Sequence, residues 1–493
     1  MHKQDFIFFF NKVAILVKKE YNLEKELERK ENMNLKIKDI IKCTNGILIT
    51  GNEECECENF SRDTRFVKKG DTFVAIKGES FDGNLFWKEA FDNGADTVII
   101  NKIEISKEDL QKYKNKNKNI IQVEDSKKAL AQIATEKRKL YKDLIVVGVT
   151  GSVGKTSTKD IIANVISQKY KTLKTQGNMN NDIGLPFTIL NLRDHEAAVI
   201  EMGMNHLGEI SKLTKIAKPT LSVITNIGTS HIGNLGSREN ILKAKLEILE
   251  GMDIPKLVIN NDNDMLNGFA QKSDIEIHTF GIENKSDCNA ININKEENST
   301  EFYAKLKNEE IALKVPVGGD VFVLNSLCAT LVGKIVGLST EQIQKGISSF
   351  ELTKKRMEII KINNGITLIN DSYNASFDSM KAAIEYLSNT KSTRKIAVLG
   401  DMFELGKYSE ELHRKVGAEV AKNHIDLLFA VGENSKYIAK EAENYGMEKE
   451  KIYYFNDRQE LLEKLKNTME KGDSILFKAS NGMKLFEIVE KLK

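Results

Sequence analysis

The sequence predicts an α/β protein of three domains: a small α/β domain, a central domain with a doubly wound, mostly parallel sheet, and a C-terminal Rossmann-like domain. The chain has 493 residues, about three times the ~150 residues usual for one domain. Apolar runs typical of strands buried on both faces alternate with helical segments. This alternation restarts at about residue 351, which predicts a second parallel sheet.

The first domain is assigned to residues 33–125, which contain short strands and turns. Residues 71–76 are predicted to form a strand that ends in a Gly-containing turn. A helix over 86–94 and a strand over 96–100 follow. A helix followed by an apolar strand indicates a small α/β unit.

Residues 1–32 are interpreted as a non-essential N-terminal extension. The apolar run 6–16 is interrupted by Asn11 and Lys12, and a charged stretch follows in place of a small-residue cleavage site. A cleaner globular pattern begins at Met33. A signal peptide is therefore disfavoured.

The central domain is assigned to residues 126–350. A continuous apolar run, 144–148, is predicted to be a buried parallel strand between two helices, 126–141 and 156–168. Polar and apolar residues alternate over 285–318, which predicts a β-excursion at the edge of the sheet, and helix 323–336 is expected to close the domain. Further buried strands are predicted at 197–201, 221–225 and 257–260.

The C-terminal domain is assigned to residues 351–493. Its strands are predicted at 366–369, 395–399, 427–431, 452–455 and 474–477, with helices between them.

The composition excludes several classes of protein. Lys and Arg total 73 against 71 Asp and Glu, and the net charge of +2 argues against nucleic acid or an anionic membrane as the main partner. No apolar run approaches the ~20 residues that span a bilayer. The cysteines are five in number, and Cys55 and Cys57 lack zinc-site spacing. These features are typical of a cytoplasmic protein with reduced thiols.

A phosphate-binding loop is predicted directly after strand 144–148. The segment Thr150-Gly-Ser-Val-Gly-Lys-Thr156 precedes a helix, and its glycines allow backbone N–H groups to surround phosphate oxygens. Lys155 is expected to reach the β- and γ-phosphates, and the Thr156 hydroxyl to bind Mg²⁺. The full pattern requires glycine at position 149, where valine stands.

Three further residues carry side chains that could bind a metal or a charged group. Glu201 ends strand 197–201, where doubly wound sheets bind ligands, so it is a candidate metal ligand, or else a solvated strand-end acid. His231 lies in a Gly-flanked loop after strand 221–225 and is either a metal ligand or a structural histidine. Lys245, on its own, is expected to be a solvated helix charge.

Together these segments resemble the Mur ligase family, ATP-dependent amide-bond ligases of peptidoglycan precursor synthesis. The resemblance covers nearly the whole chain from Met33. No Asn-Lys-x-Asp motif of a GTPase is found in a suitable place. The matching segments are 63–65, 69–75, 78, 81–83, 150–156, 177–181, 184–186, 201–203, 208–209, Asn226, His231, Arg356, 370–375 and 399–406.

The resemblance implies a ligase that uses ATP and Mg²⁺. Segments 371–375 and 399–406 favour the family member that joins D-alanyl-D-alanine to UDP-N-acetylmuramoyl-tripeptide. The first domain is then expected to bind the UDP end of the substrate, the central domain to bind ATP, and the third to contribute nucleotide contacts and to hold the dipeptide. The family is usually monomeric.

The resemblance also implies a role for each site residue. Thr156 and Glu201 resemble ligands of the magnesium that bridges ATP, and His231 a ligand of a second magnesium. Lys245 falls where the family often has a carbamylated lysine that helps to organise the metal site. The expected nucleotide contacts are Gly151, Ser152, Val153, Gly154, Lys155, Thr156, Ser157, Asn325 (adenine), Arg356 (phosphates) and Asp371 (ribose). The expected substrate contacts are Arg65, Asp82, Gly83, Asn180, Asn181 and Asn374.

The sequence departs from the family pattern outside the phosphate and metal set. The usual His-Asn before the helix of Asn325 is Val321-Phe322, and the usual Asn-Pro after Ala375 is Ser376-Phe377. Asn481 replaces a common arginine, and Asn84 replaces a histidine. These departures bear on substrate affinity rather than on the type of reaction.

Two alternatives remain open at this point. The chain could catalyse another step of the same family, or that of the related folylpolyglutamate synthase, although the latter lacks the pattern of the first domain. It could also be a non-catalytic paralogue that binds a UDP-sugar. The sequence leaves open whether the third peptide residue is lysine or diaminopimelate.

Overall fold

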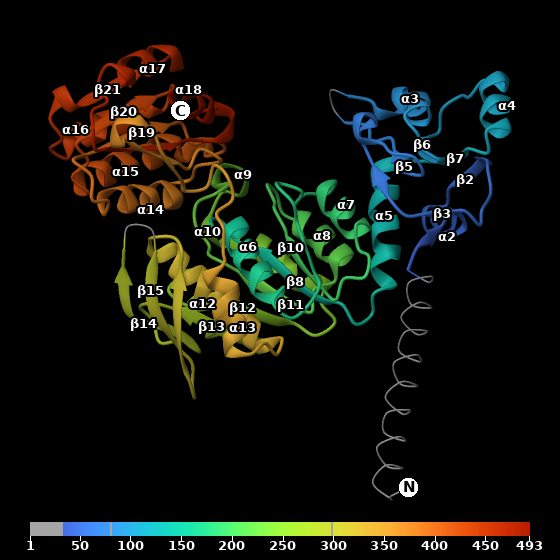
Figure 1. The fold of residues 1–493 in the computed structure, drawn as a ribbon, viewed down its shortest axis with the longest axis horizontal. Helices are drawn as coiled ribbons and strands as arrows, with labels where there is room; N and C mark the ends of the chain where they lie inside the picture. The colour runs from blue at the N-terminus through green and yellow to red at the C-terminus, as the bar shows by residue number, and fades with distance from the viewer. Residues whose placement is uncertain (1–32, 79–80, 297–298) are drawn as a thin grey trace, which may run out of the picture. The chain divides into compact units, whose positions relative to one another are not determined.

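The computed structural model describes residues 33–78, 81–296 and 299–493 (Figure 1). The predicted N-terminal extension, 1–32, lies outside them. The described chain forms two compact units. One contains residues 33–144, 175–196 and 215–218, and the other contains 145–174, 197–214 and 219–493.

The first unit is built on a five-stranded sheet of order β2-β7-β6-β5-β4. The sheet is parallel except for β2, which pairs antiparallel with β7. Its core contains the tilted rings of Trp87, Phe91 and Tyr113. The elements are β1 (Leu35–Lys36), α2 (Ile37–Thr44), β2 (Ile47–Thr50), β3 (Glu56–Cys57), β4 (Phe60–Ser61), β5 (Thr72–Val74), α3 (Trp87–Asp92), β6 (Thr97–Asn101), α4 (Lys107–Asn115), β7 (Asn119–Val123), α5 (Ser126–Lys139) and α7 (Gly184–Leu190).

The central sheet has nine strands in the order β16-β15-β14-β13-β12-β11-β8-β10-β9. It is parallel from β9 to β14, and β15 is antiparallel to both of its neighbours, β14 and β16. The predicted β-excursion is therefore confirmed as the edge of this sheet. The strands are β8 (Ile145–Thr150), β9 (Thr172–Lys174), β10 (Ala197–Glu201), β11 (Leu221–Ile224), β12 (Lys256–Asn260), β13 (Glu276–Gly281), β14 (Cys288–Lys295), β15 (Thr300–Lys305) and β16 (Glu310–Val315).

Helices cover both faces of the central sheet. On one face, residues of α6, α12 and α13 form a hydrophobic core with the strands. On the other, Pro219 and Ile248 pack closely on Gly148 of β8, where a Cβ atom would lie 3.0 and 3.2 Å from their side chains. The helices are α6 (Lys155–Ile166), α8 (Glu209–Ala217), α9 (Ile232–Leu235), α10 (Arg238–Leu246), α11 (Asp264–Ala270), α12 (Asp320–Ile335) and α13 (Thr340–Ser348). The prediction that helix 323–336 closes the domain is wrong, because α13 follows α12 and packs on α6 and β16.

The C-terminal sheet has the order β17-β18-β22-β19-β20-β21 and is parallel except for β17. Ile396 and Val398 of β19 pack with α17 and α18, while the alternate residues Ala397 and Leu399 are also fully buried. Both faces are thus covered, as expected for a Rossmann-like domain. The elements are β17 (Glu358–Lys361), β18 (Thr367–Asn370), α14 (Phe377–Ser388), β19 (Arg394–Gly400), α15 (Ser409–Lys422), β20 (Leu427–Val431), α16 (Ser435–Asn444), β21 (Ile452–Phe455), α17 (Arg458–Lys466), β22 (Asp473–Lys478) and α18 (Phe486–Leu492).

Candidate active site

The predicted phosphate loop connects β8 to α6, and its glycines are sterically required. Gly154 has φ +79°, in the left-handed region that favours glycine. A Cβ atom on Gly151 would lie 1.9 Å from Oγ1 of Thr225. The loop therefore folds as the sequence predicts, with a strand before it and the N-terminus of a helix directly after it.

The loop is held by the segment that follows β11. The backbone N–H of Ser152 donates to the carbonyl of Asn226 at 3.0 Å, and that of Val153 donates to Oδ1 of Asn226 at 2.9 Å. The Oγ of Ser230 donates to the carbonyl of Ser152 at 3.1 Å. Residues 225–233, here called the histidine loop because they include His231, are thus fixed against the phosphate loop.

Thr156 and Glu201 come together as the motif predicts. The Thr156 hydroxyl donates to Oε2 of Glu201 at 2.8 Å, and both side chains are buried. Glu201 is 2% exposed, so it is not a solvated strand-end acid. A hydroxyl and a carboxylate at the end of a buried strand form an oxygen donor pair of the kind that Mg²⁺ takes alongside phosphate. The structure therefore fits a phosphate-bound magnesium at this point.

Lys155 lies inside the phosphate loop. Its Nζ donates to the carbonyl of Gly151 at 2.8 Å. Burial lowers the pKa of Lys155, while the nearby Glu201 carboxylate raises it and the Arg356 guanidinium lowers it. Glu201 and Arg356 are thus within electrostatic range of this ammonium.

The expectation that the charge of Lys245 is solvated is wrong. The side chain is 1% exposed rather than a solvated helix charge, because α10 turns this position into the fold. Burial lowers the pKa of Lys245 well below its usual value, and the neighbouring Lys155 cation lowers it further. The two lysines therefore lie close enough to interact, as expected if both belong to one site.

His231 is presented by an unusual backbone conformation. Its φ is +62° at the N-cap of α9, uncommon for a residue other than glycine. Nδ1 of its imidazole pairs with Oε2 of Glu404, and this hydrogen bond lowers the pKa of the Glu404 carboxyl. His231 therefore bridges the histidine loop and the segment after β19.

The three predicted nucleotide contacts outside the phosphate loop have different surroundings. Asn325 of α12 accepts a hydrogen bond from Thr158 of α6 at 2.8 Å, and its buried Nδ2 has no hydrogen-bond partner among the described residues. The guanidinium of Arg356 stacks on the ring of Tyr373 at 4.0 Å. Asp371 pairs with the buried ammonium of Lys478.

Lys478 also contacts the carbonyl of Asn374, at 3.1 Å. Oδ1 of Asp371 accepts a hydrogen bond from the backbone of Met357 at 3.2 Å. The carboxylate of Asp371 thus already has two protein partners, which hold the turn after β18 in place.

The remaining predicted substrate contacts lie in the first unit. Arg65 pairs with Asp63 and is largely exposed. Asp82 caps a 3₁₀ turn, Gly83–Phe86, and accepts from Asn84. Gly83 packs so tightly that a Cβ would lie 2.7 Å from the carbonyl of Ile76. Oδ1 of Asn181 accepts from the backbone of Gly184 at 2.8 Å at the start of α7, and Asn180 precedes it.

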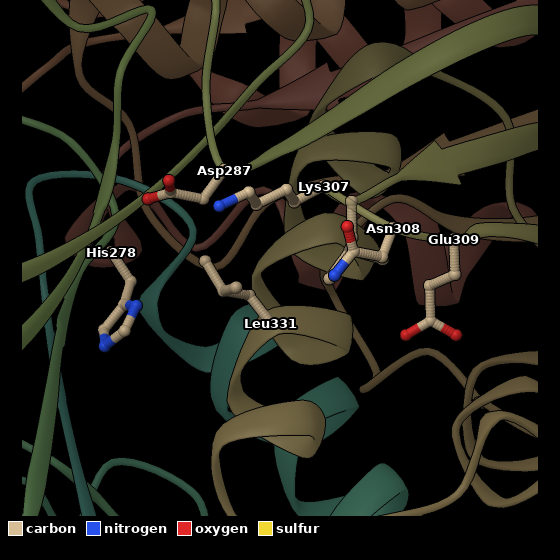
Figure 2. A pocket seen from close by; sticks show the side chains of 7 residues that line it. His278, Asp287, Lys307, Asn308, Glu309 and Leu331 are labelled. Atoms are coloured by element: carbon tan, nitrogen blue, oxygen red, sulfur yellow. The ribbon is translucent and has the colours of Figure 1, made fainter.

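A cavity of about 550 Å³ lies elsewhere, beside the β-excursion (Figure 2). Both carboxylates that line it already have partners: Asp287 accepts from Thr279, and Glu309 pairs with Lys334. No residue of the phosphate loop lines it. We therefore do not assign the cavity to the active site.

Sequence reasoning missed several residues that the fold brings to this site. Glu404 was part of a matching segment, but its contact with His231 crosses 173 positions. Asp378 of α14 accepts from the backbone and the hydroxyl of Thr229 in the histidine loop, at 2.8 and 2.9 Å. No local pattern distinguishes these acids from other surface carboxylates. Among the described residues, no group of three or more His, Cys, Asp or Glu side chains could hold a metal.

Known sequence families match three segments of the chain. Residues 58–138 match the Mur ligase family, catalytic domain; 149–333 match the Mur ligase middle domain; and 355–481 match the Mur ligase, glutamate ligase domain. Two curated relatives are named UDP-N-acetylmuramoyl-tripeptide–D-alanyl-D-alanine ligase. The protein from Bacillus subtilis is 37% identical over 92% of this chain and 98% of its own length. The protein from Escherichia coli is 32% identical over 87% of this chain and 92% of its own length.

Solved structures of ligases named MurF are also similar to this chain. MurF from Acinetobacter baumannii superposes with a TM-score of 0.82 and 29% identity, over 93% of this chain and 98% of that one. MurF ligase from Thermotoga maritima, solved in complex with ADP, superposes with a TM-score of 0.76 and 30% identity, over 88% and 96%. The fold is the three-domain arrangement of these ligases, as the sequence predicts. The chain belongs to the Mur ligase family.

Proposed function

We propose that this protein is an ATP-dependent ligase that joins D-alanyl-D-alanine to the tripeptide carboxylate of UDP-N-acetylmuramoyl-tripeptide, in peptidoglycan precursor synthesis. The observation that carries the proposal is the buried hydrogen bond between Thr156 and Glu201 beside an intact phosphate loop. Relatives named for this activity, alike over about nine-tenths of the chain, support the choice of substrates.

The charges of the site suit the first chemical step. The tripeptide carboxylate attacks the γ-phosphate of ATP, and an acyl phosphate and ADP result. Because two anions must meet, Lys155 and Arg356 are assigned to neutralise the transferring phosphoryl group and to position it. The amine of D-alanyl-D-alanine then attacks the acyl carbon, and phosphate leaves.

The metal set is assigned to Thr156, Glu201, His231 and Lys245. Bound magnesium would shield the charge of the ATP phosphates. Thr156 and Glu201 supply oxygen atoms for it, and His231 is held nearby by the histidine loop. Lys245 is assigned as a carbamylated residue, a role that its burial beside Lys155 supports, since the modification would replace a second buried cation with a carboxylate.

The other assignments extend those from the sequence. Backbone groups of 151–157 are proposed to bind the phosphates. Asn325 is proposed to contact adenine, because no partner for its buried Nδ2 lies in the part of the chain that the structure describes. Asp371 is proposed to contact the ribose. Arg65, Asp82, Gly83, Asn180, Asn181 and Asn374 are proposed to contact the other substrates.

We propose further that the domains run over 33–125, 126–350 and 351–493, after an extension of 1–32. The first domain would bind the UDP end of the substrate, the second ATP, and the third the dipeptide. Among the described residues no helix is long and apolar enough to cross a membrane. A cytoplasmic monomer that acts on small-molecule substrates is the form we propose.

The test is ATP-dependent phosphate release with the UDP-linked tripeptide, in which D-alanyl-D-alanine is compared with D-alanine alone. Rapid release is expected only with the dipeptide. A Lys155→Ala variant should fold but release no phosphate above background. Equal rates with both amines, or full activity of this variant, would refute the assignment.

A further inference from the structure

The histidine loop is held from two sides. On one side it is bonded to the phosphate loop, where Oγ of Ser152 accepts from the backbone of Gly228 at 2.9 Å. On the other side it is bonded to the C-terminal domain, where Asp378 accepts from Thr229. The loop is therefore one direct physical link between the phosphate site and the C-terminal domain.

The backbones approach very closely where Glu404 meets this loop. The N–H of Gly233 donates to the carbonyl of Glu404 at 3.0 Å, and a Cβ on Gly233 would lie 2.6 Å from that same oxygen. The hydroxyl of Tyr408 donates to the carbonyl of Gly236 at 2.6 Å. The segment 403–408 is thus docked by its main chain and by the Tyr408 hydroxyl, independently of the Glu404 side chain.

The position of Glu404 is fixed by its own domain. Its φ is +61°, a conformation that persists in a non-glycine residue only where the surroundings enforce it. The preceding residues supply that enforcement: the N–H of Met402 donates to Nε2 of His413 and the N–H of Phe403 donates to Oγ of Ser480, at 3.0 and 2.8 Å. The carboxylate is therefore held in place to receive His231.

A carboxylate that accepts the Nδ1–H of an imidazole fixes the ring orientation and leaves the Nε2 lone pair free for a metal or a proton. We propose that Glu404 is a positioning residue: it sets the tautomer and orientation of His231, so that the C-terminal domain completes the metal and phosphate site of the central domain. The part of this inference that concerns metal binding rests on the function proposed above.

The first measurement is the tautomer of His231, read from ¹⁵N spectra of protein labelled at histidine, with a His231→Gln variant for assignment. Wild-type protein is expected to hold the Nδ1–H form. Glu404→Ala is expected to shift His231 toward the Nε2–H form, whereas Glu404→Gln keeps an acceptor oxygen and should retain the wild-type signal. An unchanged tautomer in Glu404→Ala would overturn the proposal.

The second measurement is the affinity for Mn²⁺ in the presence of ADP, followed by electron paramagnetic resonance without any peptide substrate. Glu404→Ala is expected to weaken Mn²⁺ binding about 10- to 100-fold, as for other residues that orient a metal ligand, and Glu404→Gln to restore most of it. Tyr408→Phe removes the hydrogen bond from the Tyr408 hydroxyl to Gly236 in the same segment, and it should change the Mn²⁺ affinity less than about twofold. Equal losses in Tyr408→Phe and Glu404→Ala would show that Glu404 only docks the domain. Because neither measurement uses the ligase substrates, both outcomes stand even if the chain ligates other molecules.

Discussion

At the scale of single residues, the proposed nucleotide site depends on contacts between side chains that lie far apart in the sequence, such as that of Thr156 with Glu201. Thr156 and Glu201 were predictable, because a phosphate-loop hydroxyl and a strand-end acid share an edge of the sheet in this fold. The burial of Lys245 was not, because it depends on how α10 packs rather than on any local pattern. The contact of Glu404 with His231 was equally unpredictable from the sequence, since it joins residues 173 positions apart.

Replacing Thr156 by valine tests whether the hydroxyl of Thr156 acts with the Glu201 carboxylate as an oxygen donor pair for the metal. The variant keeps the shape of the side chain but removes the hydroxyl that donates to Glu201. Phosphate release is expected to fall at least about 100-fold, since the loss of a residue that only orients a metal ligand already costs 10- to 100-fold. Thr156→Ser retains the hydroxyl and should keep most of the activity. Comparable rates for the valine and serine variants would exclude a role for this oxygen.

His413 predicts a pH dependence of stability. Burial lowers its pKa from 6.5, and Nε2 of the neutral ring accepts from the backbone of Met402. A histidine whose pKa is lower in the folded state contributes stability that is complete above the unfolded pKa and is lost as pH falls below it. Urea unfolding of wild type and His413→Gln at several pH values should therefore show their difference shrinking below about pH 6.5. A constant difference would contradict this.

At the scale of elements, the long buried strands were predicted best. The bounds of β10 and β20 agree with the sequence predictions, because continuous apolar runs signal strands of a parallel sheet. β9 has only three residues, all half-buried, at the edge of the central sheet. β13 is polar and half-exposed over most of its length. Neither carries the apolar signal, and both were missed.

Helix α17 offers a test of local stability far from the phosphate loop in sequence. The side chain of its N-cap residue, Asp457, accepts from the backbone N–H groups of Gln459 and Glu460, at 2.7 and 3.1 Å. Asp457→Ala should cost about 1 kcal/mol, whereas Asp457→Asn keeps a cap oxygen and should cost little. Hydrogen exchange of the peptide 458–466, followed by mass spectrometry, is expected to be several-fold faster in the alanine variant. The same exchange rate in both variants would argue against capping.

At the scale of the whole molecule, the proposed nucleotide site uses residues from the central and the C-terminal domains. The sequence predicts the domains, because each has its own alternation of strands and helices. It does not predict how they are brought together, which depends on contacts such as that of Thr229 with Asp378, 149 positions apart. We expect the domains to close over ATP and substrate before reaction.

Small-angle scattering measures this closure directly. The radius of gyration is expected to decrease when an ATP analogue and the UDP-linked tripeptide are added together, because ordering of the site requires groups from separate domains to converge. The UDP-linked tripeptide alone should produce a smaller change. No compaction with both ligands would count against closure.

The transfer of ¹⁸O from substrate to phosphate tests the central claim most directly. The UDP-linked tripeptide is labelled with ¹⁸O in its terminal carboxylate and incubated with ATP and D-alanyl-D-alanine. If the carboxylate attacks the γ-phosphate, one labelled oxygen leaves with each phosphate, and mass spectrometry should detect it there. Amide product accompanied by unlabelled phosphate would contradict an acyl phosphate and the role that we assign to this phosphate site.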